Sequence, residues 1–103
     1  MNVGIDIAEV KRFENAKLDG AFSADEMKYI NVQPNRAETM AGLFCAKEAY
    51  FKAVGTGVMR SKLPTVEIAH GAGGRPFYKN DTKAVLSISH TKSTAVAVCI
   101  LVD

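Results

Sequence analysis

The sequence predicts a single α+β domain in which one long helix packs on an antiparallel sheet. Residues 36–54 form one long stretch between a helix-starting and a helix-ending signal, whereas most of the other apolar residues alternate as they do in strands. A chain of 103 residues has room for only one hydrophobic core of ordinary size. We therefore expect residues 1–103 to form one small domain.

The first third of the chain predicts a strand followed by two short helices. Val3–Ala8 alternates apolar residues with Gly4, Asp6 and Ala8, so Asp6 is expected to point away from the apolar face of a strand. Glu9–Ala16 can form a short helix. Ser23–Ile30 predicts another, because it opens with a serine and, three residues later, a glutamate in capping-box spacing.

The long helix is predicted over about Arg36–Val54. Asn35 and Glu38 have the spacing of an N-terminal cap, and Gly55 is a suitable end signal. Because successive helix residues are about 100° apart, Glu48 falls within the apolar stripe centred on Phe44. A charged side chain is therefore expected in a largely apolar face.

The second half of the chain predicts strands. Thr65–Ala69 and Arg75–Lys79 flank a glycine-rich segment that we interpret as a hairpin turn, since no helix pattern follows it as in a phosphate-binding loop. Ala84–His90 and Thr94–Val102 are two further strands across a short polar turn. The last strand is apolar on both faces and so needs cover on both sides, and we expect another subunit to supply one of the two covers.

Composition excludes several classes of function. Thirteen basic residues against eleven acidic ones give a net charge of +2, which is too mild to indicate a nucleic-acid-binding protein. The sequence has neither a signal peptide nor an apolar run of membrane-spanning length, so we expect a cytoplasmic protein that does not bind membranes. Cys45 and Cys99 lack metal-site spacing and are expected to be buried, reduced residues.

The stretch FCAKEAYFKAVGTG, residues 44–57, places Lys47, Glu48 and Lys52 among core residues. Burying an unpaired carboxylate costs several kcal/mol, so Glu48 must meet a cation, a metal ion or solvent. The simplest interpretation is an ordinary ion pair between Glu48 and Lys52, which lie one helical turn apart. The alternative is that these charges belong to a site.

Three segments together resemble the holo-acyl-carrier-protein synthase family, the small class of 4′-phosphopantetheinyl transferases. They are GID at Gly4–Asp6, the helix motif with its following GTG, and LSISHT near the C-terminus. The resemblance extends over nearly the whole chain. It implies the 4′-phosphopantetheinyl transferase fold and transfer of phosphopantetheine from coenzyme A to a serine of apo acyl carrier protein, releasing adenosine 3′,5′-bisphosphate and supporting fatty acid biosynthesis.

The resemblance also implies the site residues. Asp6 and Glu48 are expected to hold Mg²⁺, or Mn²⁺, because this class of ion needs only one or two carboxylates beside substrate phosphates. Asp6, Glu48 and Lys52 are the expected catalytic residues, with Glu48 or a metal-bound water as the base. Coenzyme A is expected to contact Lys47, Lys52, Gly55, Thr56, Gly57, Ser89 and His90. Arg12, with Lys11, is expected to dock the acidic carrier protein.

The resemblance further implies a homotrimer with active sites between subunits. Leu43 stands where the family commonly has a basic residue, so one charge contact with coenzyme A or the carrier is expected to be missing. Two alternatives belong to other classes of function. One is a coenzyme A or nucleotide-binding module that does not catalyse, and the other is a structural or partner-binding protein in which Glu48 and Lys52 form only an ion pair.

Overall fold

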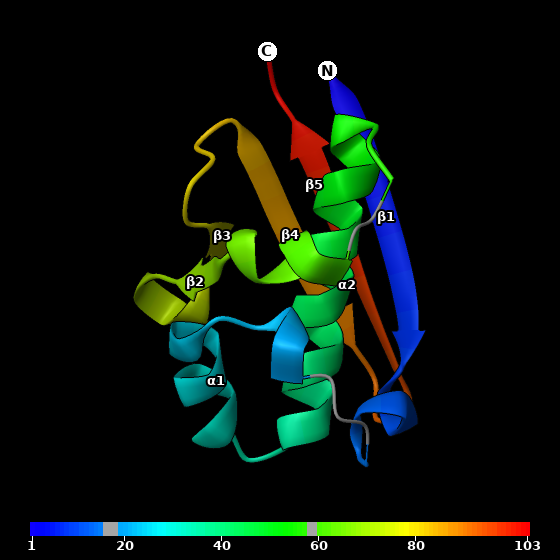
Figure 1. The fold of residues 1–103 in the computed structure, drawn as a ribbon, viewed down its shortest axis with the longest axis vertical. Coiled ribbons are helices and arrows are strands. Elements are labelled where there is room, and N and C mark those ends of the chain that lie inside the picture. The colour runs from blue at the N-terminus through cyan, green and yellow to red at the C-terminus, as the bar shows by residue number, and fades with distance from the viewer. Residues whose placement is uncertain (16–18, 58–59) are drawn as a thin grey trace.

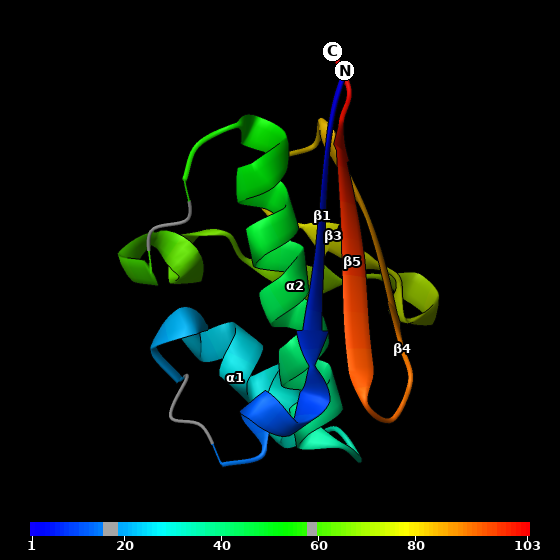
Figure 2. The ribbon, with the colours of Figure 1, turned by 90° about the vertical axis from the view of Figure 1, so that its right-hand side faces the viewer.

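A three-stranded antiparallel sheet with one long helix across it organises the molecule. The computed structural model describes residues 1–15, 19–57 and 60–103. The strands lie in the order β1 (Asn2–Glu9), β5 (Thr94–Leu101) and β4 (Ala84–His90), and helix α2 (Arg36–Val54) runs along one face (Figures 1 and 2). This arrangement confirms the predicted α+β class.

The ends of α2 lie where the sequence predicts them. The Asn35 side chain accepts a hydrogen bond of 3.0 Å from the backbone N–H of Glu38, and so caps the first turn. Gly55 follows the last residue with a left-handed φ of 91°, the backbone conformation in which glycine commonly ends a helix. Between them the helix is buried on most sides, because the sheet covers one face and smaller elements cover the other.

The strand β1 lies very close to α2 at Gly4. A Cβ atom at this position would overlap the carbonyl oxygen of Ala49 and crowd the backbone nitrogen of Ala53. Only glycine permits this approach. The same face of β1 turns Asp6 towards the helix, whereas the alternate residues Val3, Ile5 and Ile7 are 59–68% exposed on the opposite face of the sheet.

The seam between α2 and the sheet contains both cysteines. On β5 the small residues Ala95, Ala97 and Cys99 are buried beneath the helix. Cys45 lies on the helix side, with its Sγ 3.7 Å from the carbonyl oxygen of Ala95. Both thiols are free and buried, as predicted.

The other face of the sheet is covered by no element of the described chain (Figure 2). Its apolar side chains come from all three strands, and the β5 members are only partly buried. They are Val3, Ile5, Ile7, Val85, Val96, Val98 and Ile100, a set that we call the outer sheet face. The prediction that β5 needs cover on both sides is thus met on one side within this chain.

The smaller elements pack against the side of α2 that faces away from the sheet, or at its edge. Helix α1 (Ala24–Asn31) begins with the predicted capping box at Ser23, and strands β2 (Ile68–His70) and β3 (Pro76–Tyr78) form the predicted hairpin. Short 3₁₀ segments make up η1 (Val10–Phe13), η2 (Asp19–Ala21), η3 (Arg60–Thr65) and η4 (Ala72–Gly74).

Two predicted boundaries were wrong. Instead of a helix over Glu9–Ala16, of which residue 16 lies outside the described part, the chain forms the short η1 turn. This turn is held by Val10, whose N–H donates to the Ser93 carbonyl. The strand predicted from Thr65 begins only at Ile68, because the preceding residues form η3 and contain Pro64, which has no N–H to donate.

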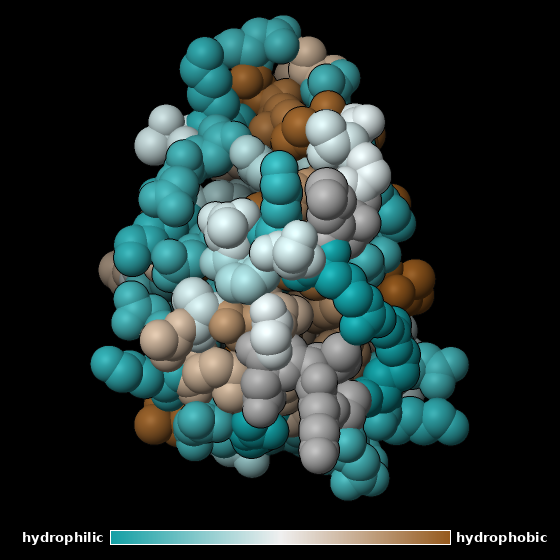
Figure 3. Space-filling model, in the orientation of Figure 1, coloured by the Kyte–Doolittle hydropathy of each residue, from teal (hydrophilic) through white to brown (hydrophobic). Residues whose placement is uncertain are grey.

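The surface seen from the side of α2 is mostly hydrophilic (Figure 3). Teal residues cover much of both flanks in this view, with brown patches near the chain ends and at the edges. Among the described residues, no helix combines the length and the apolar character needed to cross a bilayer.

Candidate active site

Two carboxylates from different elements face each other beside the seam. Asp6 lies in the middle of β1, opposite Ala97 of β5, and Glu48 lies on the neighbouring face of α2. Burial raises the pKa of Glu48 from 4.5 to about 7, and a hydrogen bond to Asp6 together with the negative charge of Asp6 adds to this rise. Near neutral pH Glu48 is thus partly protonated, and a cation bound here would compete with that proton.

Lys52 completes this group. Its ammonium nitrogen lies 3.0 Å from the carbonyl oxygen of Ile5 and 3.1 Å from Asp6 Oδ1, and its side chain is 51% exposed. The described residues contain no close ion pair between Glu48 and Lys52, so the simplest sequence interpretation of these charges was wrong. An ammonium group has three donors, and the two used here leave one directed to solvent or a ligand.

Arg12 lies beside the carboxylates, although sequence reasoning gave it only a docking role. Its guanidinium is 5.5 Å from the ring centroid of Phe13 and 5.4 Å from that of Phe44, a geometry typical of cation–π contacts. Its charge partly offsets the upward shift in the pKa of Glu48. Lys11 is exposed on the same turn and lines an open groove with Lys92 of the β4–β5 turn.

Lys47 points away from this site into the protein. Its ammonium is fully buried and lies 2.6 Å from Glu26 Oε1, 2.9 Å from the Leu63 carbonyl oxygen and 2.7 Å from that of Val66. These three acceptors use all its donors. The expected contact between Lys47 and a nucleotide does not match this arrangement, because the ammonium is buried and all its N–H donors are already bonded within the protein.

The glycine-containing turn expected to contact coenzyme A follows directly after α2. Gly55, Thr56 and Gly57 are exposed, and Gly55 comes three residues after Lys52. The structure therefore brings this turn to the same end of the helix as the exposed ammonium.

Ser89 and His90 lie elsewhere in the chain. They are exposed at the end of β4, and the strand order puts β4 and β1 on opposite edges of the sheet. His90 Nδ1 is 3.0 Å from Glu38 Oε1, a contact that sequence reasoning missed because Glu38 was interpreted only as part of a helix cap. Glu38 and His90 line an open cleft, and Leu43 and Pro76 form part of its apolar wall.

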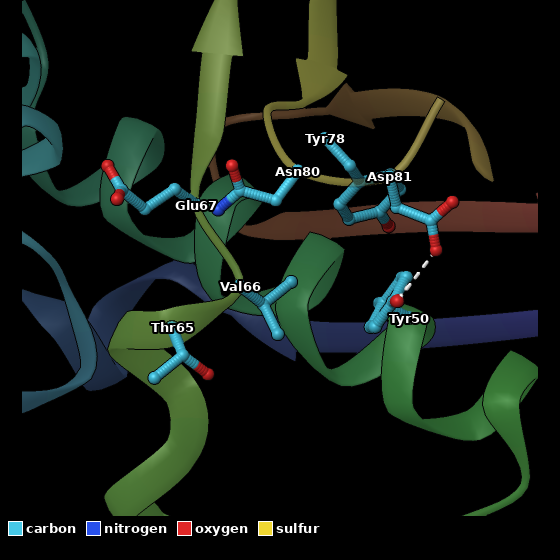
Figure 4. Close-up of a pocket in the computed structure, with 7 residues that line it drawn as sticks. All are labelled: Tyr50, Thr65, Val66, Glu67, Tyr78, Asn80 and Asp81. Carbon is cyan, nitrogen blue, oxygen red and sulfur yellow. Dashed lines mark hydrogen bonds between the residues drawn. The ribbon is translucent and has the colours of Figure 1, made fainter. Parts of the chain in front are cut away.

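A small pocket on the side of α2 away from β1 contains none of the expected site residues (Figure 4). It is lined by Tyr50, Thr65, Val66, Glu67, Tyr78, Asn80 and Asp81. Tyr50 donates a 2.7 Å hydrogen bond to Asp81 Oδ2, and burial followed by this contact raises the pKa of Tyr50 to about 12. The tyrosine therefore stays protonated at neutral pH and holds the segment before β4 against the helix.

Comparison with known proteins agrees with the geometry. A family model described as the 4′-phosphopantetheinyl transferase superfamily matches residues 2–99. The holo-[acyl-carrier-protein] synthase of Caldicellulosiruptor bescii is 40% identical over 96% of this chain and 95% of that protein. The protein of the same name from Alkaliphilus oremlandii is 36% identical over 97% of both.

Solved structures give the same result. The crystal structure of a holo-(acyl-carrier-protein) synthase from Bacillus anthracis in complex with coenzyme A (3′,5′-ADP) matches with a TM-score of 0.86 and 34% identity, over 97% of this chain and 94% of that one. The corresponding synthase of Neisseria meningitidis matches with a TM-score of 0.84 and 27% identity, over 99% and 98%. The chain therefore belongs to the 4′-phosphopantetheinyl transferase superfamily, and within it to the holo-[acyl-carrier-protein] synthase enzymes.

Proposed function

We propose that this enzyme transfers 4′-phosphopantetheine from coenzyme A to a serine of apo acyl carrier protein, releasing adenosine 3′,5′-bisphosphate. The observation that carries the proposal is the group of Asp6, Glu48 and Lys52, in which two carboxylates and an exposed ammonium meet. The Bacillus anthracis relative, whose structure contains coenzyme A, supports the same substrate. The proposal includes a cytoplasmic location and a role in fatty acid biosynthesis.

The carboxylate pair fits a hard divalent cation, and Asp6 and Glu48 would hold Mg²⁺ or Mn²⁺ there. Two adjacent carboxylates, of which Glu48 is otherwise partly protonated near neutral pH, are a favourable place for such an ion. Among the described residues no cluster of three metal-binding side chains is present. This suits Mg²⁺, which commonly takes its remaining ligands from substrate phosphates and water. When bound, the ion would neutralise charge on the diphosphate of coenzyme A.

Lys52 supplies a positive charge that the chain itself holds in place. Its bonds to Ile5 and Asp6 fix the ammonium, and its remaining donor can reach a phosphate oxygen. Phosphoryl transfer depends mainly on positioning and on neutralising the charge of the transferred group. Lys52 thus orients the diphosphate and stabilises charge that develops on it.

Arg12 and Lys11 would receive the carrier protein. Acyl carrier proteins are acidic, and complementary charge accelerates and orients such encounters. Because Arg12 lies close enough to affect the pKa of Glu48, a carrier bound at Arg12 would bring its serine next to the carboxylates.

The outer sheet face supports a homotrimer with sites shared between subunits. This face exposes several large apolar side chains, and a second copy of the chain would bury them. In one chain, Ser89 and His90 lie across the sheet from Asp6, so a neighbouring copy would have to bring them to the diphosphate held near Lys52 and Gly55–Gly57. Light scattering should give three times the chain mass, and a monomeric Val98→Asp variant should lose activity.

The proposed function is tested by mass spectrometry of an apo acyl carrier protein incubated with the enzyme, coenzyme A and Mg²⁺. We expect the carrier to gain one phosphopantetheine group, and we expect this gain to be lost with EDTA or with Glu48→Ala. If coenzyme A binds while two unrelated carriers stay unmodified, the non-catalytic binding module replaces the proposal. The apolar Leu43 in the cleft beside His90 is the feature that would favour that outcome.

A further inference from the structure

The buried ammonium of Lys47 joins three stretches of the chain that are distant in sequence. Lys47 itself belongs to α2, Glu26 to α1 and Leu63 to η3, and Val66 precedes β2. The Glu26 carboxylate also accepts bonds of 2.9 Å from the backbone N–H groups of Ser23 and Ile68. We call Lys47, Glu26 and the two carbonyls the lysine hub.

The lysine hub is complete without any ligand. Lys47 is 0% and Glu26 2% exposed, and the described residues contain no buried side-chain nitrogen or oxygen that lacks a partner. Burial lowers the pKa of Lys47, and the contact with Glu26 opposes this shift. A charge buried this deeply is tolerated only while its carboxylate and carbonyl partners stay in place.

The lysine hub fixes to α2 the far end of the segment that leaves this helix at the proposed coenzyme A site. The chain departs from the helix at Gly55, next to Lys52, and returns to the middle of the helix when Leu63 and Val66 reach Lys47. Leu63 and Val66 are the points at which the chain is fixed to α2 again after Gly55, and a connection that is fixed at both ends has fewer conformations. The position of the turn Gly55–Gly57 therefore depends on an ammonium two helical turns earlier.

The lysine hub also sets the rotation of α2. Consecutive residues of a helix point about 100° apart, so a Lys47 fixed inwards directs Glu48 towards β1 and Asp6. A helix free to rotate by a fraction of this angle would separate the two carboxylates. Both consequences act on the site from a residue that does not touch it.

We propose that Lys47 is a positioning residue of the coenzyme A site, acting through Leu63, Val66 and Glu26 rather than by contact with the substrate. The inference rests on the proposed function, because the site that it positions is the one assigned there. It replaces the direct nucleotide contact implied by family resemblance with an internal role.

Two variants separate this role from the alternatives. Lys47→Met removes the cation and leaves the Glu26 carboxylate buried without a counter-charge, so the melting temperature should fall by about 10 °C or more. The double variant Lys47→Met with Glu26→Gln removes both charges and should recover much of this loss. It nevertheless cannot restore a cation to the Leu63 and Val66 carbonyls. Lys28→Met, the same substitution at an exposed position of α1, is the matched control.

Steady-state kinetics are measured well below the melting temperature of each variant, with coenzyme A and carrier protein varied separately. We expect the double variant to raise the KM for coenzyme A about tenfold or more and the KM for the carrier less than twofold. Unchanged kinetics in the folded double variant would overturn the inference and leave Lys47 with a purely structural role. A raised KM in Lys47→Met without a lower melting temperature would overturn it in favour of direct contact.

The wild-type enzyme assayed in parallel keeps the two proposals apart. If it does not modify the carrier, the proposed function fails. If it does, and the double variant is kinetically normal, only the positioning role of Lys47 fails.

Discussion

Lys47 and Lys52 occupy the same helix and the same sequence motif, yet they stand in opposite environments. The Lys47 ammonium is fully buried and bonded to three acceptors of the protein. The Lys52 ammonium is bonded to two, on a side chain that is 51% exposed. A difference of five positions turns the two side chains to different sides of α2, because five steps of about 100° do not return to the same face.

The comparison shows that residue type in a motif does not determine its role. A lysine whose donors are all used internally can act on a substrate only through the residues that it binds, whereas one with a spare donor at the surface can contact a substrate directly. The region around Lys47 should therefore respond to mutation mainly through stability, and the region around Lys52 mainly through activity. Four predictions test this division, in order of decreasing effect.

The largest effect is expected from Glu26→Ala, on the buried side. The change leaves the Lys47 ammonium and two backbone N–H groups without their carboxylate, and breaking a buried pair in this way costs about 3–5 kcal/mol. Urea unfolding measures the loss. Asp25→Ala, at the exposed neighbouring position, is the control and should change the free energy of unfolding by less than about 1 kcal/mol. Equal losses in the two variants would contradict the assigned importance of the lysine hub.

Lys52→Met should have a large effect on catalysis instead. Loss of the charge that Lys52 directs at the proposed diphosphate should lower kcat about 100-fold, as removal of a single catalytic donor commonly does. Thermal unfolding should change little, since the Lys52 side chain is half exposed and solvent screens its pair with Asp6. A variant that unfolds at a much lower temperature and keeps its kcat would contradict this division, because Lys52 would then contribute to stability and not to catalysis.

The exposed side should also be sensitive to pH through Glu48. Its pKa is raised from 4.5 to about 7, so in the metal-free enzyme a cation must displace a proton below pH 7 but not above it. Mn²⁺ affinity, followed by electron paramagnetic resonance, should rise up to about tenfold per pH unit below 7 and level off above. Glu48→Gln should bind weakly at every pH. An affinity that is flat from pH 6 to 8 in the wild type would rule out a proton on Glu48 that the cation displaces.

The smallest effect is expected at Tyr50, which faces the pocket on the buried side. Tyr50→Phe removes the hydrogen bond to Asp81 and should cost about 1 kcal/mol of stability. Activity at 25 °C should be unchanged, because no expected site residue lines this pocket. A kcat lowered tenfold in this variant would show that the two sides of α2 are not as separate as we infer.

The parts of the fold that depend on local signals could be predicted from the sequence. The boundaries of α2 follow from the cap at Asn35 and the left-handed residue Gly55. Strands β1 and β4 follow from alternation, and β5 follows from a continuous apolar run after a polar turn. The beginning of β2 could not be predicted. It is set by η3, whose Leu63 carbonyl accepts a hydrogen bond from the Lys47 ammonium, sixteen positions earlier. A bond between residues so far apart produces no periodic pattern in the sequence.

The candidate site divides in the same way. The sequence indicated that Asp6, Glu48 and Lys52 act together, and the structure brings these three side chains into one group. The interior role of Lys47 and the contact of Glu38 with His90 were missed. Both depend on partners that distant segments supply, since helical periodicity shows which side of a helix a residue faces but not what lies there.

The two cysteines between α2 and the sheet can report how often the helix separates from the sheet. Cys45 and Cys99 are fully buried between α2 and β5, and burial, followed by the charge of Asp6, raises the pKa of Cys45 to about 12. Neither thiol can be alkylated while the seam is closed, because the reagent needs both access and a thiolate. The rate of labelling by a maleimide therefore measures how often α2, which carries Glu48, separates from the sheet, which carries Asp6. No probe has to be introduced for this measurement.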